Sequence, residues 1–293
     1  MADDAIAVLG AGSTMGLPMA RNLARAGWTM LAWNRSADRA QPLAPDGIRV
    51  CATPAQAAAE AGTVLTMLAD GEAVTEVMDG PEGAIAAMPQ SAIWLQMSTI
   101  GEAATERCAR LAASRGITFV DAPVLGTREP AEQAKLVILA SGPDNARGRV
   151  QPVFDVIGRK TIWAGETGAG TRLKLVVNNW ILSVLEGGAE TIALAEGLRV
   201  DPALFFAAIE GGPLDLPFLR TKGKAISERN FEPSFRLTLA AKDARLVSEA
   251  AQRHGLDLPL PRVIAQRLAE GATAHGEEDM SATYLTSAPS GAG

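Results

Sequence analysis

The chain has 293 residues, of which 47% are hydrophobic and only 4% aromatic, so alanine and the aliphatic residues must fill its cores. This length is comfortable for two domains. The formal net charge of -6 and the absence of any basic run argue against nucleic acid as a partner, because phosphate contacts need clustered lysine and arginine.

The first residues, MADDAIAVLG, are acidic and run directly into a strand-like segment, which is not the pattern of a signal peptide. The sequence contains no run of about 18 apolar residues, so no membrane span is expected. The two cysteines, Cys51 and Cys108, lie far apart and predict neither a disulfide framework nor a zinc site. We therefore expect a cytoplasmic protein without a bound metal.

Up to about residue 163, short apolar segments alternate with helical patterns. The expected strands are 5–10, 29–33, 47–51, 63–68, 92–97, 118–120 and 136–140. The expected helices between them include 15–26, 54–61, 103–114 and 144–156. This alternation predicts a parallel sheet with helices on both faces.

After residue 163 the pattern becomes entirely helical. The expected helices are 171–198, 202–210, 237–253 and 261–274. The sequence therefore predicts an α/β domain, residues 1–163, followed by an all-α domain, residues 164–293.

The segment AIAVLGAGSTMG places Gly10, Gly12 and Gly16 between the first strand and the first helix. This strand–turn–helix context is that of the dinucleotide fingerprint, in which glycines admit the pyrophosphate to the positive end of the helix. The spacing is one residue longer than usual, and the hydroxyls of Ser13 and Thr14 could add phosphate contacts. The alternative is a plain turn between strand and helix.

The second strand ends in Asn34, Arg35 and Ser36, where an NAD-binding protein usually carries a carboxylate for the ribose 2′-hydroxyl. Arg35 can instead pair with a 2′-phosphate, and its neighbours can donate hydrogen bonds to that phosphate. This pattern favours NADP. The alternative is a solvated arginine in a surface turn.

The segment GAGTRLKLVVNNW, residues 168–180, begins the first helix of the second half. One face of this helix is an apolar stripe, made of Leu173, Val176, Val177, Trp180 and Val184. Lys174 and Asn178 stand four residues apart and share another face. A lysine in a largely apolar helix costs free energy unless it has a partner or a task, although it could also extend its amine to water.

Four separated segments resemble the β-hydroxyacid dehydrogenase family, which is related to 3-hydroxyisobutyrate dehydrogenase. They are MGLPMARNLARAG, DAPVLG at 121–126, GAGTRLKLVVNN at 168–179 and FRLTLAAKDARL at 235–246. EPAEQAKLVILASG at 129–142 and EEDMSATY at 277–284 resemble the glyoxylate/succinic semialdehyde reductase branch in particular. The resemblance implies a Rossmann-type N-terminal domain for NADP, a long interdomain helix, and an all-α domain that binds substrate and forms a dimer or tetramer.

By this resemblance Lys174 is the catalytic lysine and Asn178 its partner, while Thr99 lies near both nicotinamide and substrate. An ammonium beside a carbonyl can stabilise the oxyanion that hydride delivery creates and can donate its proton. The expected cofactor-binding residues are Gly10, Gly12, Ser13, Thr14, Met15, Asn34, Arg35, Ser36, Met67, Leu68, Thr99 and Lys242.

One position departs from the family pattern D-A-P-V-S-G, because Leu125 replaces the serine that helps to hold the substrate carboxylate. Gly126 N–H, Thr127 or Arg128 could compensate, or the substrate could be less polar than a short carboxylate. The expected substrate-binding residues are therefore Thr99, Leu125, Gly126 and Thr127.

The sequence thus predicts an NADPH-dependent reductase that converts a small aldehyde or keto acid, such as succinic semialdehyde or glyoxylate, to the hydroxyacid. One alternative is reduction of an imine, for which Lys174 is unusual but Leu125 is suitable. The other is a non-catalytic NADPH-binding module that serves interactions, which the pair of Lys174 and Asn178 disfavours.

Overall fold

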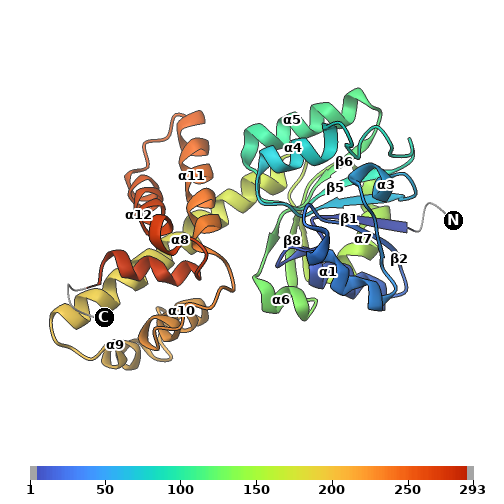
Figure 1. Cartoon of the computed structure of the whole chain (residues 1–293). Helices are drawn as coiled ribbons and strands as arrows, with labels where there is room; N and C mark the ends of the chain where they lie inside the picture. Colours follow the sequence, from blue (N-terminus) through green and yellow to red (C-terminus); the bar gives the residue numbers. More distant parts are fainter. Residues whose placement is uncertain (1–4, 289–293) are drawn as a thin grey trace. The chain divides into compact units, whose positions relative to one another are not determined.

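The structure of the protein is a computed structural model that describes residues 5–288. Its contacts divide the chain into two compact units, the first ending at Lys174 and the second beginning at Leu175. Figure 1 shows both units, with colours that follow the chain from its N-terminus to its C-terminus. We describe each unit by itself.

Unit 1 is built on a six-stranded sheet of order β3-β2-β1-β4-β5-β6, and every neighbouring pair is parallel. Its strands are β1 (Ala5–Leu9), β2 (Thr29–Trp33), β3 (Arg49–Val50), β4 (Thr63–Thr66), β5 (Ile93–Gln96) and β6 (Thr118–Asp121). The order reverses between β1 and β4, which is the switch point where doubly wound sheets bind dinucleotides. The predicted Rossmann-type fold is therefore present.

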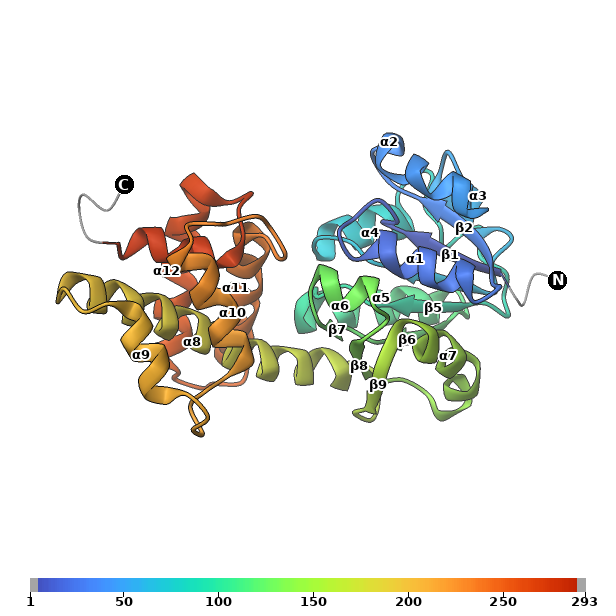
Figure 2. The ribbon, with the colours of Figure 1, turned by 90° about the horizontal axis from the view of Figure 1, so that it is seen from below.

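Helices cover both faces of this sheet (Figure 2). They are α1 (Gly16–Arg25), α2 (Ala37–Ala40), α3 (Pro54–Ala58), α4 (Gly71–Asp79), α5 (Gly101–Ser114), α6 (Arg128–Glu132) and α7 (Asp144–Ile157). Alternate residues of β1 serve different cores: Ile6 and Val8 pack with α1 and α7, whereas Ala7 and Leu9 pack with α3, α4 and α5. This two-residue period explains why β1 is buried at every position.

A second, three-stranded sheet contains β7 (Val124–Leu125), β8 (Leu136–Ala140) and β9 (Gly158–Trp163). The segment 136–140 is a strand as predicted, but it does not extend the large parallel sheet. The reason is that β6 ends at Asp121 and meets this region only through an isolated bridge to Ser141. The chain then reverses, so that β7 pairs antiparallel with β8 while β9 pairs parallel with it.

The described part of unit 2 contains helices and no strand. The helices are α8 (Ala169–Gly197), which begins in unit 1, then α9 (Pro202–Ile209), α10 (Pro217–Ser227), α11 (Leu237–Arg253) and α12 (Pro259–His275), with a final 3-10 helix, Met280–Thr286. Leu182 and Leu185 of α8 pack with Leu237, Ile264 and Leu268 in its core. Over the described residues, none of the helices combines the length and apolar character needed to cross a membrane.

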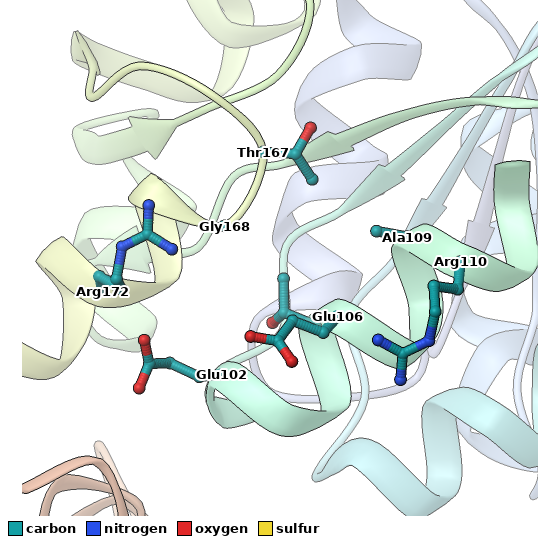
Figure 3. A pocket seen from close by; sticks show the side chains of 8 residues that line it. Glu102, Glu106, Ala109, Arg110, Thr167, Gly168 and Arg172 are labelled. Atoms are coloured by element: carbon teal, nitrogen blue, oxygen red, sulfur yellow. The ribbon is translucent and has the colours of Figure 1, made fainter. Parts of the chain in front are cut away.

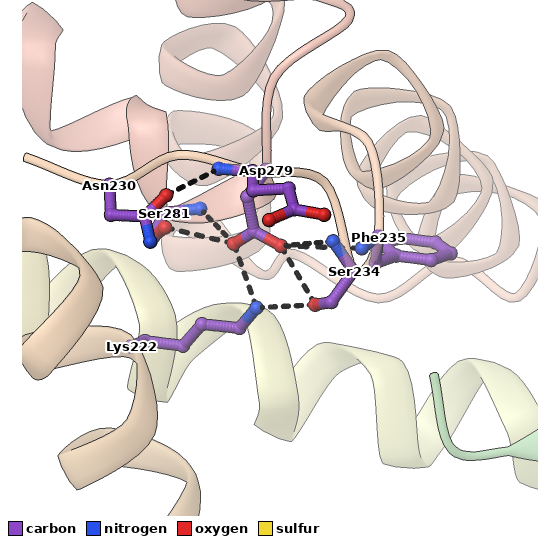
Figure 4. A network of polar contacts seen from close by, with 7 residues as sticks. Lys222, Asn230, Ser234, Phe235, Asp279 and Ser281 are labelled. Carbon is purple, nitrogen blue, oxygen red and sulfur yellow. Dashed lines mark hydrogen bonds and ion pairs between the residues drawn. The ribbon is translucent and has the colours of Figure 1, made fainter. Parts of the chain in front are cut away.

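In unit 2, a buried ion pair joins α10 to the segment EEDMSATY, residues 277–284 (Figure 4). Lys222 of α10 donates to Asp279 Oδ1 over 2.7 Å, and both side chains are almost fully buried. Asp279 Oδ2 also accepts from the backbone N–H and the hydroxyl of Ser234, at 3.0 and 2.8 Å. Burial opposes ionisation of this carboxyl, but the charge and hydrogen bonds of Lys222 prevail and lower its pKa to about 2.

Candidate functional site

The glycine turn lies at the carboxyl end of β1, beside the end of β4. Gly10 has φ +92°, and a Cβ at this position would lie 2.2 Å from the carbonyl oxygen of Met67. A Cβ at Gly12 would lie 2.6 Å from Cβ of Arg39. Only glycine therefore fits at these two positions, and the resulting bare backbone before the start of α1 forms a cradle of the kind that admits a pyrophosphate.

Ser13 and Thr14, where the turn is one residue longer than usual, differ in what their side chains do. The hydroxyl of Ser13 accepts from the backbone N–H of Gly16 over 2.9 Å and donates to the carbonyl of Met67 over 3.4 Å. This serine therefore closes the longer loop from within. Thr14 is exposed and Met15, which immediately precedes α1, is half-buried.

The three residues after β2 also divide into two roles. The side chain of Asn34 braces the loop, because its Oδ1 accepts from Gly12 N–H at 3.2 Å and its Nδ2 donates to the carbonyl of Ser36 at 2.9 Å. Arg35 and Ser36 are exposed. Arg39 in α2 is exposed as well and stands next to Gly12, a second cation that the sequence reasoning missed. Its signal was a basic residue one helical turn after Arg35.

A buried polar network fixes the ends of β4 and β5. The backbone N–H of Leu68 donates to the hydroxyl of Ser98 over 2.8 Å. Gln96 holds the same serine from both sides, accepting from its backbone N–H and donating to its carbonyl, each at 2.8 Å. Thr99, half-buried, follows this rigid stretch directly. Leu68 and Thr99 are thus presented at the carboxyl edge of the sheet, where ligands of this fold bind.

Leu125 ends the short strand β7, where it pairs with Val137 of β8 and is half-buried. Gly126 follows with φ +128°, and a Cβ there would lie 2.8 Å from a methyl of Leu136. Thr127 precedes α6, and its side chain makes no capping hydrogen bond. The turn after Leu125 therefore depends on glycine.

In α8 the polar pair lies on the buried side. Lys174 is 8% exposed and Asn178 is 4% exposed, whereas Val176 and Trp180 of the apolar stripe are 67% and 63% exposed. The helix thus turns part of its apolar stripe outward and its lysine and asparagine inward. Burying an amine and an amide is costly unless each has partners, which indicates a specific role for this face.

Within unit 2, Asn178 and Lys242 are joined by one carboxylate. The amide Nδ2 of Asn178 donates to Asp243 Oδ2 over 2.8 Å, and Lys242 Nζ lies 2.7 Å from Asp243 Oδ1. Asp243 is 4% exposed. The sequence reasoning placed Lys242 in the site but gave no role to Asp243, and only its adjacency in FRLTLAAKDARL pointed to it.

No three histidine, cysteine, aspartate or glutamate side chains gather as a metal site in the part of the chain that the structure describes. The candidate functional residues of unit 1 are the glycine cradle and the buried Lys174. Those of unit 2 are the buried amide of Asn178 and the carboxylate of Asp243, which links this amide to Lys242.

A glycine cradle at the switch point of a doubly wound sheet, followed by a helical unit, is the arrangement of an NAD(P)-dependent dehydrogenase. Two family models match the chain: the NAD binding domain of 6-phosphogluconate dehydrogenase over residues 5–165, and the NAD-binding of NADP-dependent 3-hydroxyisobutyrate dehydrogenase over residues 168–286. The chain belongs to the β-hydroxyacid dehydrogenase family and is an oxidoreductase of that family.

Individual relatives agree with this assignment. The uncharacterized oxidoreductase YfjR of Bacillus subtilis is 32% identical over 91% of this chain and 93% of its own. Glyoxylate/succinic semialdehyde reductase 2, chloroplastic, of Arabidopsis thaliana is 30% identical over 94% of this chain and 77% of its own. The structure of Mycobacterium tuberculosis 3-hydroxyisobutyrate dehydrogenase with L-serine superposes with a TM-score of 0.87 at 30% identity, covering 97% of this chain and 98% of that one.

Proposed function

We propose that the protein is an NADPH-dependent reductase of a small aldehyde or keto acid, of the succinic semialdehyde or glyoxylate type, with Lys174 as general acid. The observation that carries the proposal is that Lys174 and Asn178 of α8 are buried, although Val176 and Trp180 of the same helix are exposed. A lysine is kept in such a position when its charge has a task.

The residues of unit 1 fit a bound dinucleotide. Gly10 and Gly12 leave room that any Cβ would fill, and the loop already uses the N–H groups of Gly12, Ser13 and Gly16 internally. The N–H groups of Thr14 and Met15, just before α1, are therefore the candidate donors to the pyrophosphate. Met67 and Leu68 border the same loop.

The preference for NADPH rests on the exposed end of β2. No carboxylate stands between Trp33 and Asp38 to repel a 2′-phosphate, and both Arg35 and Arg39 are exposed there. A guanidinium forms paired hydrogen bonds with phosphate. Asn34 contributes indirectly, through its bond to Gly12, and Ser36 offers an exposed hydroxyl.

The proposed chemistry of this chain is proton donation and charge stabilisation. The bound nicotinamide supplies the hydride. Lys174 stabilises the negative charge that develops on the carbonyl oxygen and donates its proton to that oxygen. Asn178 is held in orientation by Asp243, and the same carboxylate fixes Lys242. Thr99, Leu125, Gly126 and Thr127 are proposed to border the substrate.

The domain roles are part of the proposal. Residues 1–163 bind the cofactor, and residues 164–293 contribute substrate contacts and the surface for self-association. The substrates are named from what relatives act on: the Arabidopsis protein is a glyoxylate/succinic semialdehyde reductase.

The test is NADPH consumption with succinic semialdehyde, glyoxylate, methylmalonate semialdehyde and a cyclic imine, each repeated with Lys174→Ala. We expect turnover of a semialdehyde or of glyoxylate, reduced about 10²- to 10⁴-fold in Lys174→Ala, with the Kd for NADPH nearly unchanged. Lys160→Ala, at an exposed lysine in β9, is the matched control and should retain full activity.

Three other results would each overturn part of the proposal. Unchanged turnover in Lys174→Ala removes the lysine from its role. Turnover of the imine alone identifies an imine reductase and makes Leu125 a specificity residue. Tight NADPH binding with no turnover of any of the four removes the proposed substrate type and leaves either a substrate outside this panel or the non-catalytic module.

A further inference from the structure

The first turn of α8 is held by a completely buried carboxylate at the end of β6. Asp121 Oδ2 accepts from the backbone N–H of Thr171 over 2.8 Å, and Oδ1 accepts from the hydroxyl of the same threonine, also over 2.8 Å. The hydroxyl of Ser141 donates to Oδ2 over 3.2 Å. All three residues are at most 2% exposed. One carboxylate therefore takes three hydrogen bonds, two of them from a single helical residue.

Ser141 completes this attachment from the end of β8. Its hydroxyl oxygen accepts from the backbone N–H of Gly170 over 2.9 Å. A Cβ at Gly170 would lie 2.2 Å from the carbonyl oxygen of Leu139, so the helix begins in close contact with the strand backbone. We call Asp121, Ser141 and Thr171 the α8 anchor. It satisfies two of the backbone N–H groups that every helix leaves unpaired at its start, and its negative charge suits the positive end of the helix.

The anchor lies almost one helical turn before the proposed acid. Lys174 follows Thr171 by three residues, so the two side chains project from the same side of the helix, with an axial rise of about 4.5 Å between them. Thr171 is 2% exposed and Lys174 is 8% exposed. A shift or rotation of this first turn would carry the ammonium of Lys174 with it.

We infer that Asp121 is a positioning residue for the reduction, which through Thr171 sets the rotation and axial position of α8 and thereby the place of the Lys174 ammonium. This inference rests on the proposed function, because it assigns Asp121 a role only through Lys174. A misplacement of about 1 Å in a reacting group is enough to cost about 10²-fold in rate.

A hydroxyl chain connects the anchor to the surface. The hydroxyls of Thr171 and Thr105 lie 3.1 Å apart, and Thr105 lines a pocket of about 320 Å³ between α5 and the start of α8 (Figure 3). The charged side chains that line this pocket are Glu102, Glu106, Arg110 and Arg172. Two hydroxyl groups, those of Thr171 and Thr105, thus lie between Asp121 and this pocket.

The anchor should respond to pH just below neutrality. Burial raises the pKa of Asp121 to about 6, against the lowering effect of its bonds from Thr171 and Ser141 and of the charge of Arg172. Cys108 of α5 also interacts with it, and burial raises the pKa of that thiol to about 12, so it stays neutral. Asp121→Asn should then behave at every pH like the wild-type enzyme at acid pH.

The experiment is a double-mutant cycle on the full chain with Asp121→Ala, Lys174→Ala and both together, measured with NADPH and the best substrate of the panel above. We expect Asp121→Ala to lower kcat at least about tenfold with little change in the Kd for NADPH. Lys174→Ala should then cost far less in the Asp121→Ala background than in the wild type. Additive effects, or a wild-type kcat in folded Asp121→Ala, would overturn the inference.

Two further measurements keep the test valid should Asp121→Ala fold poorly. Thr171→Ser keeps the hydroxyl and should retain kcat, whereas the isosteric Thr171→Val should lose it with NADPH binding intact; equal kcat in the two would count against the anchor. The kcat of the wild type should fall below about pH 6 toward that of Asp121→Asn, which should itself show no such fall.

If Lys174→Ala alone has no effect, the proposed function fails and the anchor's role fails with it. Loss in Lys174→Ala with additivity removes the anchor's role alone.

Discussion

Arg35 is the residue at which the choice between the two nicotinamide cofactors can be tested directly. It is exposed after β2, where no carboxylate stands before Asp38. Arg35→Ala should raise KM for NADPH about 10- to 100-fold and leave KM for NADH nearly unchanged, because only NADPH carries the 2′-phosphate. Steady-state kinetics with both cofactors measure this difference.

The matched control for Arg35 is Arg25→Ala, which removes an exposed arginine from the last turn of α1. It should change neither KM. Equal increases for NADPH and NADH in Arg35→Ala would mean that the arginine holds the loop rather than the phosphate. Arg39→Ala measures in the same way whether the second cation shares the task.

At this scale the sequence predicted residue types better than their orientation. The sequence predicts that Asn34 donates a hydrogen bond to the cofactor. In the structure its Oδ1 accepts from Gly12 and one Nδ2 hydrogen is donated to Ser36, so the second Nδ2 hydrogen is left for that use. A pattern of polar residues after a strand cannot distinguish the two uses, because both need the same amide. In α8, likewise, a helical period cannot reveal that Trp180 faces outward and Lys174 inward.

Among the elements, the strands of the large sheet were predictable because each is a short, continuous apolar run between turns. The segment 29–33 was predicted with its observed bounds, and so was the helix 237–253. The sequence reasoning missed α4 and α10. Helix α4 is short, and its N-terminus is capped by Asp70, which accepts from Ala73 N–H. Helix α10 buries the charged Lys222, so its buried face does not show as an apolar stripe in the sequence.

The membership of 136–140 in a sheet could not be predicted from its composition. A buried strand has the same composition whichever sheet it joins, and the chain beside β8 meets β6 through the bridge between Asp121 and Ser141. These two residues are twenty positions apart, so no local pattern connects them.

The ion pair of Lys222 and Asp279 should control the acid stability of unit 2. The pKa of Asp279 in the folded chain, about 2, lies below its ordinary value of 3.8. A depressed carboxyl stabilises the fold above its unfolded pKa, and this stabilisation is lost as pH falls from about 4 through 2. Its size is on the order of 2 kcal/mol.

Lys222→Met should destabilise the protein by about 3 kcal/mol, because it leaves a buried carboxylate without its cation. Thermal unfolding at neutral pH measures this loss. Lys224→Met, two residues further along α10, removes an exposed lysine and should change the free energy of unfolding by less than about 0.5 kcal/mol. Similar effects of the two substitutions would show that the ion pair makes no specific contribution to the free energy of unfolding.

At the scale of the whole molecule, unit 2 exposes many large apolar side chains on α8 and α9. The helix α9, PALFFAAI, is entirely apolar, yet none of its residues is buried. On α8, Val176, Trp180 and Leu194 are each more than 60% exposed, and so is Leu198 directly after the helix. Exposed apolar side chains of this kind mark interaction sites, and we propose that a second copy of the chain covers those of α8.

Trp180→Glu should therefore reduce self-association, because a carboxylate on the outward face of α8 would have to be desolvated in the interface. Sedimentation velocity over a range of concentrations would report the change in mass. Leu256→Glu, at an exposed leucine after α11, is the control and should leave the mass unchanged. A wild-type protein that sediments as one chain at all concentrations would contradict the proposal.

The α8 anchor should also determine how readily the start of α8 opens to solvent. The ends of helices ordinarily fray, and their amide hydrogens exchange with solvent long before the rest of the fold opens. Here the amide hydrogens of Gly170 and Thr171 are bonded to Ser141 and Asp121, with no exposed surface at either acceptor. Release of these two hydrogens therefore requires β6 and β8 to part from the helix, so the beginning of α8 should exchange as slowly as the centre of the sheet.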